Sequence, residues 1–311
     1  MKIERILVTG RLHSELEQRL RAVIGAELRC MPEQDVSEQD LAWADAYAGF
    51  RPVPGFRSEQ YRWVHALGAG VDAFIHRRSW HPATVLTRTT GDFGRQIAEY
   101  CLGYMLADAQ RHDAFRHRQA TREWGPQAAV PLAGQSAVVF GTGSIGQTVA
   151  GALRALGVKV WGVSLQGKRD PAFDGNSALE EATGILGQAD WLINTLPLTE
   201  KTEAMFNAKL FHGLKDGCAL INVGRGGSLV EKDLIAALDT GRIRMAVLDV
   251  VSEEPLPAES PLWSREEVKI TPHIAALTGG REAALQLLDT CNALRRDQMK
   301  LPNRVQIERG Y

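Results

Sequence analysis

The sequence has little of the features that mark several protein classes. Its four cysteines, Cys30, Cys101, Cys218 and Cys291, are spread over 311 residues without a CxxC pair, so the sequence predicts neither a disulfide framework nor a metal site. No apolar run approaches the roughly eighteen residues of a membrane span. The N-terminal segment MKIER also places charge where a signal peptide needs an apolar run. We therefore expect a cytoplasmic protein with no membrane contact.

An excess of one charge sign is missing as well. Lys+Arg 36 against Asp+Glu 37 gives a net charge of −1, which removes the electrostatic signature of a nucleic-acid binder or a polybasic membrane anchor. The hydrophobic share of 44% argues against a disordered chain. A length of 311 residues exceeds one ordinary core. We therefore expect two domains and a small-molecule partner.

The first part of the chain alternates between strand and helix patterns. Strands are predicted at Ile3–Thr9, Ala46–Phe50, Trp63–Leu67 and Thr84–Thr87, and an amphipathic helix at Ser14–Val23. This alternation is typical of an α/β domain.

A long helical pattern without proline, Ile97–Phe115, predicts one helix that connects this domain to a second. Six further strands are predicted, at Ser136–Phe140, Val158–Val163, Trp191–Thr195, Ala219–Val223, Met245–Asp249 and Val268–Thr271. Because helices separate them, they predict a doubly wound parallel sheet. A last helix is expected over Glu282–Met299.

The loop GTGSIG at 141–146 runs directly out of a predicted strand into a predicted helix. In this context GxGxxG is typical of a dinucleotide site. Gly141 permits the tight turn, Gly143 lets the backbone approach a pyrophosphate, and Gly146 allows close packing of helix and strand. Free N–H groups at the start of the helix, at Ser144 and Ile145, then hold the anion. A glycine-rich turn without a ligand is the alternative.

The end of the next strand predicts the type of cofactor. The residue that reads the ribose is expected about 20 positions on, and here the strand ends at Ser164, with Lys168 and Arg169 following. An acidic residue would repel a 2′-phosphate, whereas these three groups favour it, so NADPH is preferred over NADH. Asp170 follows Gly141 by 29 residues (170 − 141) and falls late for a ribose reader, unless a long loop folds it back. A solvated loop is the alternative for Lys168 and Arg169.

Three motifs then follow in order, each at the end of a predicted strand. They are NVGRGG at 222–227, DVVSEEPL at 249–256 and TPHIAA at 271–276. Because the carboxyl ends of parallel strands surround one crevice, Arg225, Glu254 and His273 are expected to converge there. Reduction of a keto acid needs one guanidinium, one carboxylate and one imidazole. Taken singly, the three residues are a surface charge, a turn and a structural histidine.

The order and motifs of these residues resemble the D-isomer specific 2-hydroxyacid dehydrogenases. Further matching segments are LGAGVD at 67–72, AEY at 98–100, NTLPLT at 194–199 and PLW at 261–263. Within the family, the TGDFGRQ segment at 90–96 is most similar to bacterial glyoxylate/hydroxypyruvate reductases of the A type. The resemblance implies a Rossmann dinucleotide-binding domain, residues 97–283. That domain is inserted into a flavodoxin-like substrate domain made of residues 1–96 and 284–311.

The resemblance also implies a mechanism. A hydride passes from the nicotinamide to the keto carbon of a small 2-keto acid, while His273 protonates the developing alkoxide. Glu254 orients the imidazole and favours its charged form, and Arg225 grips the keto oxygen and carboxylate with paired donors.

Other positions receive roles from the resemblance. The backbone at Ala69, Gly70 and Val71 would hold the substrate carboxylate, and Asp249 would lie near the nicotinamide carboxamide. The cofactor cleft would be lined by Thr195, Pro197, Val223 and Gly224. Family members commonly pair through their dinucleotide domains, so a homodimer is expected.

Some alternatives remain open. Phe50 and Arg51 follow a strand of the first domain, where Arg51 either binds a second substrate group or is a surface arginine. The function itself has two rivals, an NAD-linked oxidative dehydrogenase and a noncatalytic scaffold that senses dinucleotide. The other seven histidines are expected to be structural or solvated.

Overall fold

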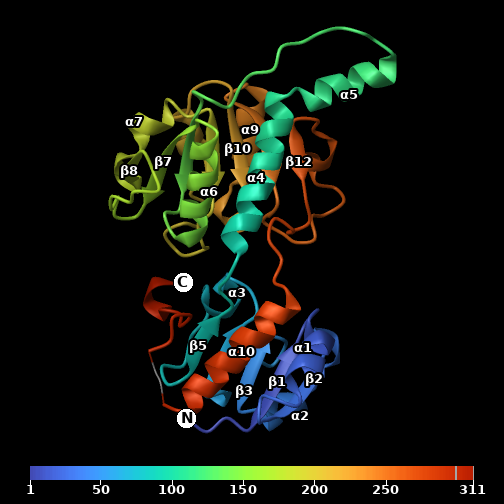
Figure 1. The fold of residues 1–311 in the computed structure, drawn as a ribbon, viewed down its shortest axis with the longest axis vertical. Helices are drawn as coiled ribbons and strands as arrows, with labels where there is room; N and C mark the ends of the chain where they lie inside the picture. Colours follow the sequence, from blue (N-terminus) through green and yellow to red (C-terminus); the bar gives the residue numbers. More distant parts are fainter. Residues whose placement is uncertain (298–299, 311) are drawn as a thin grey trace. The chain divides into compact units, whose positions relative to one another are not determined.

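The computed structural model describes residues 1–297 and 300–310, and the chain forms two compact units (Figure 1). The first consists of residues 1–93 with the described residues from 277 onward, and the second of Gly94–Ala276. The functional boundaries expected from the sequence, 96/97 and 283/284, remain predictions. Residue 311 and the end of the last predicted helix, at 298–299, lie outside the described residues.

The first unit is built on a five-stranded parallel sheet of order β2-β1-β3-β4-β5. Its strands are β1 (Arg5–Thr9), β2 (Glu27–Met31), β3 (Ala46–Gly49), β4 (Trp63–Ala66) and β5 (Val85–Arg88). Its helices are α1 (His13–Leu20), α2 (Glu38–Trp43), α3 (Asp72–Ile75) and α10 (Gly280–Arg295). This strand order is the flavodoxin-like one.

The second unit is built on a seven-stranded parallel sheet of order β12-β11-β10-β9-β6-β7-β8. Its strands are β6 (Ser136–Phe140), β7 (Lys159–Ser164), β8 (Gly175–Ala178), β9 (Trp191–Asn194), β10 (Cys218–Asn222), β11 (Ile243–Leu248) and β12 (Val268–Ile270). Its helices are α4 (Phe93–Ala109), α5 (His112–Thr121), α6 (Ser144–Ala155), α7 (Thr183–Leu186), α8 (Ala208–His212) and α9 (Glu231–Asp239). The strand order reverses between β6 and β9, which creates the crevice where doubly wound sheets bind ligands. The two-domain α/β fold predicted from the sequence is thereby confirmed.

Burial explains which strands the sequence shows clearly. Both faces of the second sheet are covered, one by α4 and α6 and the other by α8 and α9. The central strands are therefore continuous apolar runs, and Val138, Val139 and Phe140 of β6 are fully buried. The edge strands β2 and β8 are only partly buried, and neither is among the strands predicted from the sequence.

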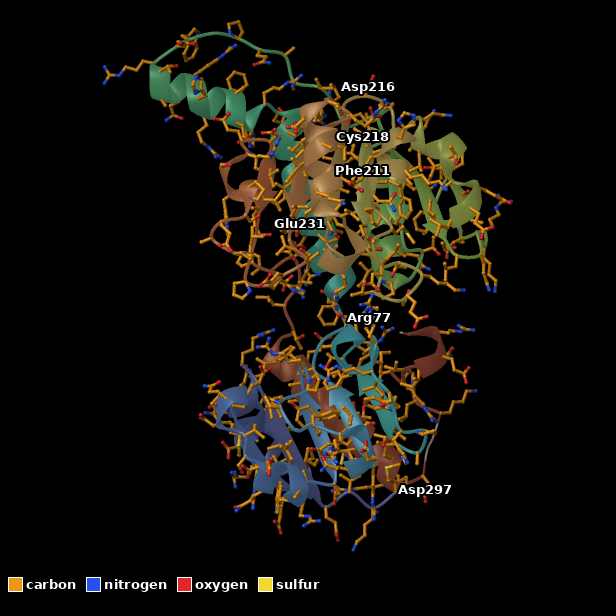
Figure 2. All side chains as sticks on the ribbon, turned by 180° about the vertical axis from the view of Figure 1, so that it is seen from behind. Arg77, Phe211, Asp216, Cys218, Glu231 and Asp297 are labelled. Carbon is orange, nitrogen blue, oxygen red and sulfur yellow. The ribbon has the colours of Figure 1, made fainter. Side chains whose placement is uncertain are left out.

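The single helix predicted over Ile97–Phe115 is wrong. The structure ends α4 at Ala109 and starts α5 at His112, because Arg111 takes the left-handed conformation, with φ of 59°. No residue of α5 is buried, and Trp124, in the loop that follows, is 102% exposed. Both views show this helix and its loop projecting from the body of the second unit (Figure 1, Figure 2). None of the helices in the described part of the chain has the length and hydrophobicity to cross a bilayer.

Candidate active site

The glycine loop leaves the end of β6 with the geometry that its spacing predicts. Gly141 has φ of 106°, a conformation that favours glycine. A Cβ at Gly146 would collide with the carbonyl of Gly141, so helix and loop touch only because this residue is glycine. A Cβ at Gly143 would meet nothing within 4 Å. The space above the loop is therefore open at the position where the sequence predicts a pyrophosphate.

The start of α6 offers free donors to that space. Gly143 is the N-cap and has no side chain to satisfy the first turn. Within the described residues, the N–H groups of Gly143, Ser144 and Ile145 have no protein acceptor. Uncapped N–H groups at a helix start form an anion site. The predicted residues thus fit the phosphates of a dinucleotide.

The end of β7, next to the glycine loop in the sheet, carries the predicted phosphate readers. The hydroxyl of Ser164 accepts the N–H of Gly167 at 3.2 Å and keeps its own proton available. Lys168 and Arg169 are exposed, and neither makes a hydrogen bond or ion pair within the described ranges. Asp170 is occupied instead, since its carboxylate accepts Gln147 Nε2 at 2.9 Å and the N–H of Ala172 at 2.9 Å.

The residues expected to line the cleft follow β9 and β10. The hydroxyl of Thr195 donates to the carbonyl of Phe140 at 2.9 Å and so fixes the start of the glycine loop. The carbonyl of Pro197 accepts the Thr202 hydroxyl at 2.6 Å. Val223 is buried and Gly224 packs against the side chain of Asn194. Contact of these groups with a cofactor stays a prediction.

Arg225 follows β10 on a loop held by buried polar groups. Its carbonyl accepts the Ser228 hydroxyl at 2.6 Å, and Asn194 Nδ2 donates to Ser228 Oγ and to Asn222 Oδ1, each at 2.8 Å. All three partners are at most 1% exposed, so the network has little freedom to move. A Cβ at Gly226 would collide with the backbone of Val251, which ties this loop to the one after β11.

Glu254 and His273 meet directly. The first lies on the loop after β11 and the second follows β12, and His273 Nδ1 lies 2.9 Å from Glu254 Oε2. An ionised carboxylate only accepts hydrogen bonds, so Nδ1 carries the proton and donates it to this bond. Both side chains are about half-exposed, at 46% and 40%. The free nitrogen, Nε2, therefore remains available to a ligand.

The pKa of Glu254 is set by the groups around it. Burial acts to raise this pKa, but the hydrogen bond and charge of His273, the Val251 N–H and the charge of Arg225 outweigh it and leave the pKa below its ordinary value. The structure therefore brings Glu254 and His273 into contact and packs the loop that carries Arg225 against the loop that leads to Glu254.

Comparison with known proteins identifies the family of the chain. The family model for the D-isomer specific 2-hydroxyacid dehydrogenase NAD binding domain matches residues 102–275. A protein of that family from Aeromonas salmonicida subsp. salmonicida A449 is 30% identical, with 98% of this chain and 100% of that chain covered and a TM-score of 0.85. The chain belongs to the D-isomer specific 2-hydroxyacid dehydrogenases. The resemblance stated from the sequence is confirmed, and the protein is an NAD(P)-dependent oxidoreductase of small 2-keto and 2-hydroxy acids.

Two further solved structures are similar to this dehydrogenase. The NADPH-dependent glyoxylate/hydroxypyruvate reductase from Sinorhizobium meliloti, solved with NADP and sulfate, is 28% identical, with 99% of this chain and 100% of that chain covered and a TM-score of 0.89. A D-isomer specific 2-hydroxyacid dehydrogenase from Xanthobacter autotrophicus Py2, solved with NADPH and MES, is 29% identical, with both chains covered fully and a TM-score of 0.85.

The predicted substrate loop of the dehydrogenase lies in the first unit, after β4. The carbonyl of Ala69 accepts Arg88 Nη1 at 3.1 Å. Within the described residues, the N–H groups of Ala69, Gly70 and Val71 have no protein acceptor. Free backbone donors suit a carboxylate, and binding of substrate by this loop stays a prediction.

Arg51 is engaged in the first unit. Its Nε lies 2.7 Å from Glu33 Oε2, and the side chain is 69% exposed. Phe50 instead carries Arg11 over its ring, at 4.7 Å from the centroid. The surface alternative for Arg51 therefore describes its position in the structure.

His65 is fully buried and has a structural role in this dehydrogenase. Its ring nitrogens lie 2.7 Å from Thr87 Oγ1 and 3.2 Å from Thr89 Oγ1. Burial lowers the pKa of His65 to about 3, so the ring stays neutral. His273 differs in having an acidic partner and an open nitrogen. The described residues contain no cluster of histidine, cysteine and carboxylate side chains fit to hold a metal ion.

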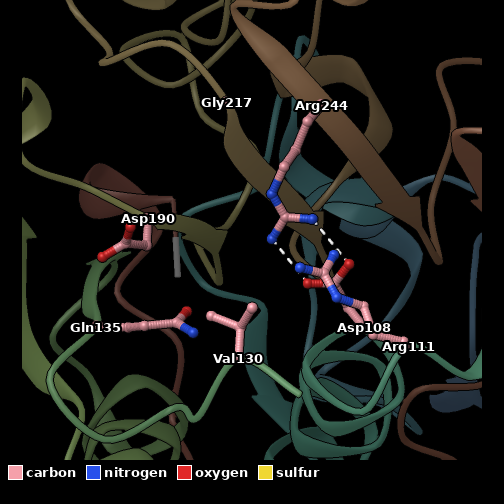
Figure 3. A pocket seen from close by; sticks show the side chains of 7 residues that line it. All are labelled: Asp108, Arg111, Val130, Gln135, Asp190, Gly217 and Arg244. Atoms are coloured by element: carbon pink, nitrogen blue, oxygen red, sulfur yellow. Dashed lines mark hydrogen bonds and ion pairs between the residues drawn. The ribbon is translucent and has the colours of Figure 1, made fainter. Parts of the chain in front are cut away.

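A pocket of about 280 Å³ lies at the opposite, amino-terminal ends of the second sheet (Figure 3). Its walls include Asp108, Arg111, Asp190 and Arg244. Arg244 makes two bonds of 2.8 Å to Asp108, and Asp190 pairs with Lys215. Both acidic side chains of this hollow are held in ion pairs, and it lies at the end of the sheet opposite to Glu254 and His273, so it is not the candidate site.

Sequence reasoning missed the groups that hold the site together. Asn194 and Asn222 stand at the last positions of adjacent strands, β9 and β10, and a polar residue at the end of an apolar run is the signal for them. Tyr100 and Thr271 lie in segments that match the family, AEY at 98–100 and TPHIAA at 271–276, but the sequence assigns neither residue a role. Their 2.6 Å contact joins residues 171 positions apart, which no local pattern reveals.

Proposed function

We propose that this dehydrogenase reduces a small 2-keto acid, of the glyoxylate or hydroxypyruvate kind, to the D-2-hydroxy acid with NADPH. The observation that carries the proposal is the 2.9 Å contact of His273 Nδ1 with Glu254 Oε2, beside Arg225. His273 is the proton donor, Glu254 is the carboxylate that orients it, and Arg225 is a cation whose paired donors suit a 2-keto carboxylate.

The chain's residues fit the cofactor. Gly143 leaves room for the pyrophosphate, Gly141 and Gly146 allow the tight turn and the close packing of helix and loop, and the first turn of α6 supplies N–H donors. When bound, the nicotinamide cofactor supplies the hydride for the reduction.

The protein's part of the chemistry is proton delivery and charge stabilisation. Glu254 holds Nδ1 of His273, so Nε2 is the atom that gives its proton to the substrate oxygen. The bond from Nδ1 to the carboxylate also fixes the orientation of the ring. Arg225 Nη1 donates to the carbonyl of Gly224 at 2.7 Å, and the planar guanidinium has further donors, whose geometry matches a carboxylate and a keto oxygen better than a lysine would.

NADPH is preferred because of the end of β7. Ser164, Lys168 and Arg169 offer a hydroxyl and two unpaired cations within the described residues, and Asp170 is held by Gln147 and Ala172. A 2′-phosphate gains charge-assisted hydrogen bonds from such groups. Neighbouring structures from Sinorhizobium meliloti and Xanthobacter autotrophicus hold NADP and NADPH, which supports the same choice.

The test is a steady-state assay of NADPH and NADH oxidation against glyoxylate, hydroxypyruvate, pyruvate and a bulkier 2-keto acid. We expect the highest kcat/KM with NADPH and either glyoxylate or hydroxypyruvate. Faster oxidation of a D-2-hydroxy acid with NAD would instead support the oxidative dehydrogenase. No turnover in either direction, with intact cofactor binding, would support the noncatalytic scaffold.

We also propose that the protein pairs as a homodimer through the projecting segment of α5 and its loop. Phe115, Trp124 and Val130 are 39%, 102% and 44% exposed, and a ten-residue helix without buried residues is marginal alone in water. Light scattering of the wild type and Trp124→Ser tests this, and we expect a dimer that weakens in the variant. A monomeric wild type contradicts it.

All four cysteines are free, which fits the reducing cytoplasm that we assign to the protein.

A further inference from the structure

The buried carboxylate of Asp249 organises the loop that carries His273. Asp249 directly follows β11 and is only 3% exposed. Its Oδ1 accepts the Thr271 hydroxyl at 2.7 Å and the N–H of Ile274 at 2.8 Å, and its Oδ2 accepts the N–H of Ala275 at 2.9 Å. Its carbonyl accepts the N–H of His273 at 2.8 Å. One residue thus contacts the loop on both sides of the histidine.

Tyr100 on α4 extends this network. Its Oη lies 2.6 Å from Thr271 Oγ1. The carboxylate of Asp249 can only accept, so the single hydroxyl proton of Thr271 goes to Asp249. Tyr100 must therefore donate to Thr271. Burial, together with the nearby charge of Asp249, raises the pKa of Tyr100, so the phenol retains the proton that this bond needs.

The loop needs such support because His273 is held in an unusual conformation. Its φ of 56° lies in the left-handed region, which residues with a Cβ rarely occupy. Such a conformation persists only where surrounding contacts determine it. Pro272, just before the histidine, contributes no N–H of its own. The bonds to Asp249 and Thr271 are the ones that fix the loop.

We propose that Tyr100 is a positioning residue for His273, acting through Thr271 and Asp249. The proposal rests on the proposed function, in which His273 is the proton donor. The hydroxyl of Tyr100 fixes the rotamer of Thr271, Thr271 and Asp249 fix the loop, and the loop sets the direction of the imidazole toward Glu254. The ring of Tyr100 packs separately, with its centroid 5.0 Å from that of Tyr104, so Tyr100→Phe removes the hydroxyl and keeps the packing.

The first test is a double-mutant cycle on Tyr100 and Thr271. We expect Tyr100→Phe to lower kcat roughly 3- to 10-fold, the usual effect of one lost hydrogen bond. The KM for the keto acid should stay within about twofold, because positioning of the proton donor matters most in the transition state. Thr271→Val should lower kcat further, and Tyr100→Phe should add nothing in that background.

Two variants serve as controls. Thr271→Ser keeps the hydroxyl and should retain nearly the wild-type kcat. Tyr61→Phe makes the same substitution in the first unit, where the buried hydroxyl has no partner among the described residues, and should leave kcat unchanged. The proposal would be overturned by additive losses of kcat in the cycle or by an unchanged kcat in Tyr100→Phe. It would also be overturned if kcat of Thr271→Ser fell as far as that of Thr271→Val.

Hydrogen exchange gives a readout that does not depend on turnover. The amides of Ile274 and Ala275 donate to Asp249, so the peptide over 271–276 should exchange faster in Tyr100→Phe and Thr271→Val than in the wild type and in Tyr61→Phe. Unchanged exchange there would refute the network even in an active enzyme. Faster exchange in a protein whose wild type reduces no keto acid would instead place the failure in the proposed function.

Discussion

The two ends of the seven-stranded sheet differ in how their charged side chains are engaged. At the amino-terminal end, Arg244 is bonded twice to Asp108 at 2.8 Å, and Lys215 pairs with Asp190. A pocket of about 280 Å³ opens among them. The paired charges join β11 to α4 and the residue before β9 to the segment before β10.

At the carboxyl-terminal end, polar groups either hold loops or stay available. Asp249 is buried and satisfied by the loop of His273, whereas Nε2 of that histidine stays open. Lys168 and Arg169 are exposed and unpaired within the described residues. The functional end of this sheet is therefore recognised by its catalytic groups and available donors, and not by the presence of a hollow.

After loss of the proton donor His273, substitution of Arg225 should have the largest effect at the carboxyl-terminal end. Arg225→Lys keeps the charge but loses the paired donors, and we expect kcat/KM to fall roughly 10²- to 10³-fold, as for loss of an oxyanion donor. Steady-state kinetics with the preferred keto acid measure it. A loss below threefold would show that the guanidinium does not bind the reacting group.

Glu254→Gln should act next most strongly, by roughly 10- to 100-fold in kcat, because a hydrogen bond to a charged partner is lost. In the wild type the pKa of Glu254 is lowered from 4.5. The carboxylate therefore stabilises the fold above pH 4.5, and this contribution disappears only as the pH falls through the lower folded value. Activity and thermal unfolding between pH 3 and 8 should show this acid limb in the wild type and lack it in Glu254→Gln. An acid limb of the same position in both proteins contradicts the assignment.

Removal of the two exposed cations near β7 should have a smaller and selective effect. In Lys168→Ala combined with Arg169→Ala, we expect the KM for NADPH to rise roughly 2- to 30-fold, the sum of two exposed charge pairs. The KM for NADH should hardly change, and it serves as the internal control. Equal losses for both cofactors would mean that these residues do not read the 2′-phosphate.

The amino-terminal end should give the smallest effect. Asp108→Asn breaks the pair with Arg244, whose side chains are 23% and 37% exposed. We expect a loss of stability of about 1 kcal/mol or less and an unchanged kcat. Thermal unfolding and the standard assay measure both. A large fall in kcat would show that the two ends of the sheet do not divide structure and function as described.

The sequence allowed the central strands and the reactive groups to be predicted, for different physical reasons. Strands covered on both faces, such as β6 and β10, are unbroken apolar runs. The edge strands β2 and β8 lack that burial and carry no such run, so they were missed. The break at Arg111 depends on one left-handed residue, which no sequence pattern marks.

The candidate site divides in the same way. Arg225, Glu254 and His273 stand in local motifs at strand ends, so topology alone predicts that they converge. The supports of these residues depend on long-range contacts, such as Asn194 with Ser228 and Tyr100 with Thr271. These partners become visible only when the chain is folded.

The most direct test of the proton donor is kcat of His273→Ala for reduction of glyoxylate or hydroxypyruvate by NADPH, with cofactor binding checked by fluorescence. The expected result is a fall of roughly 10²- to 10⁴-fold at unchanged cofactor affinity. Turnover near the wild-type rate would contradict the assignment of His273.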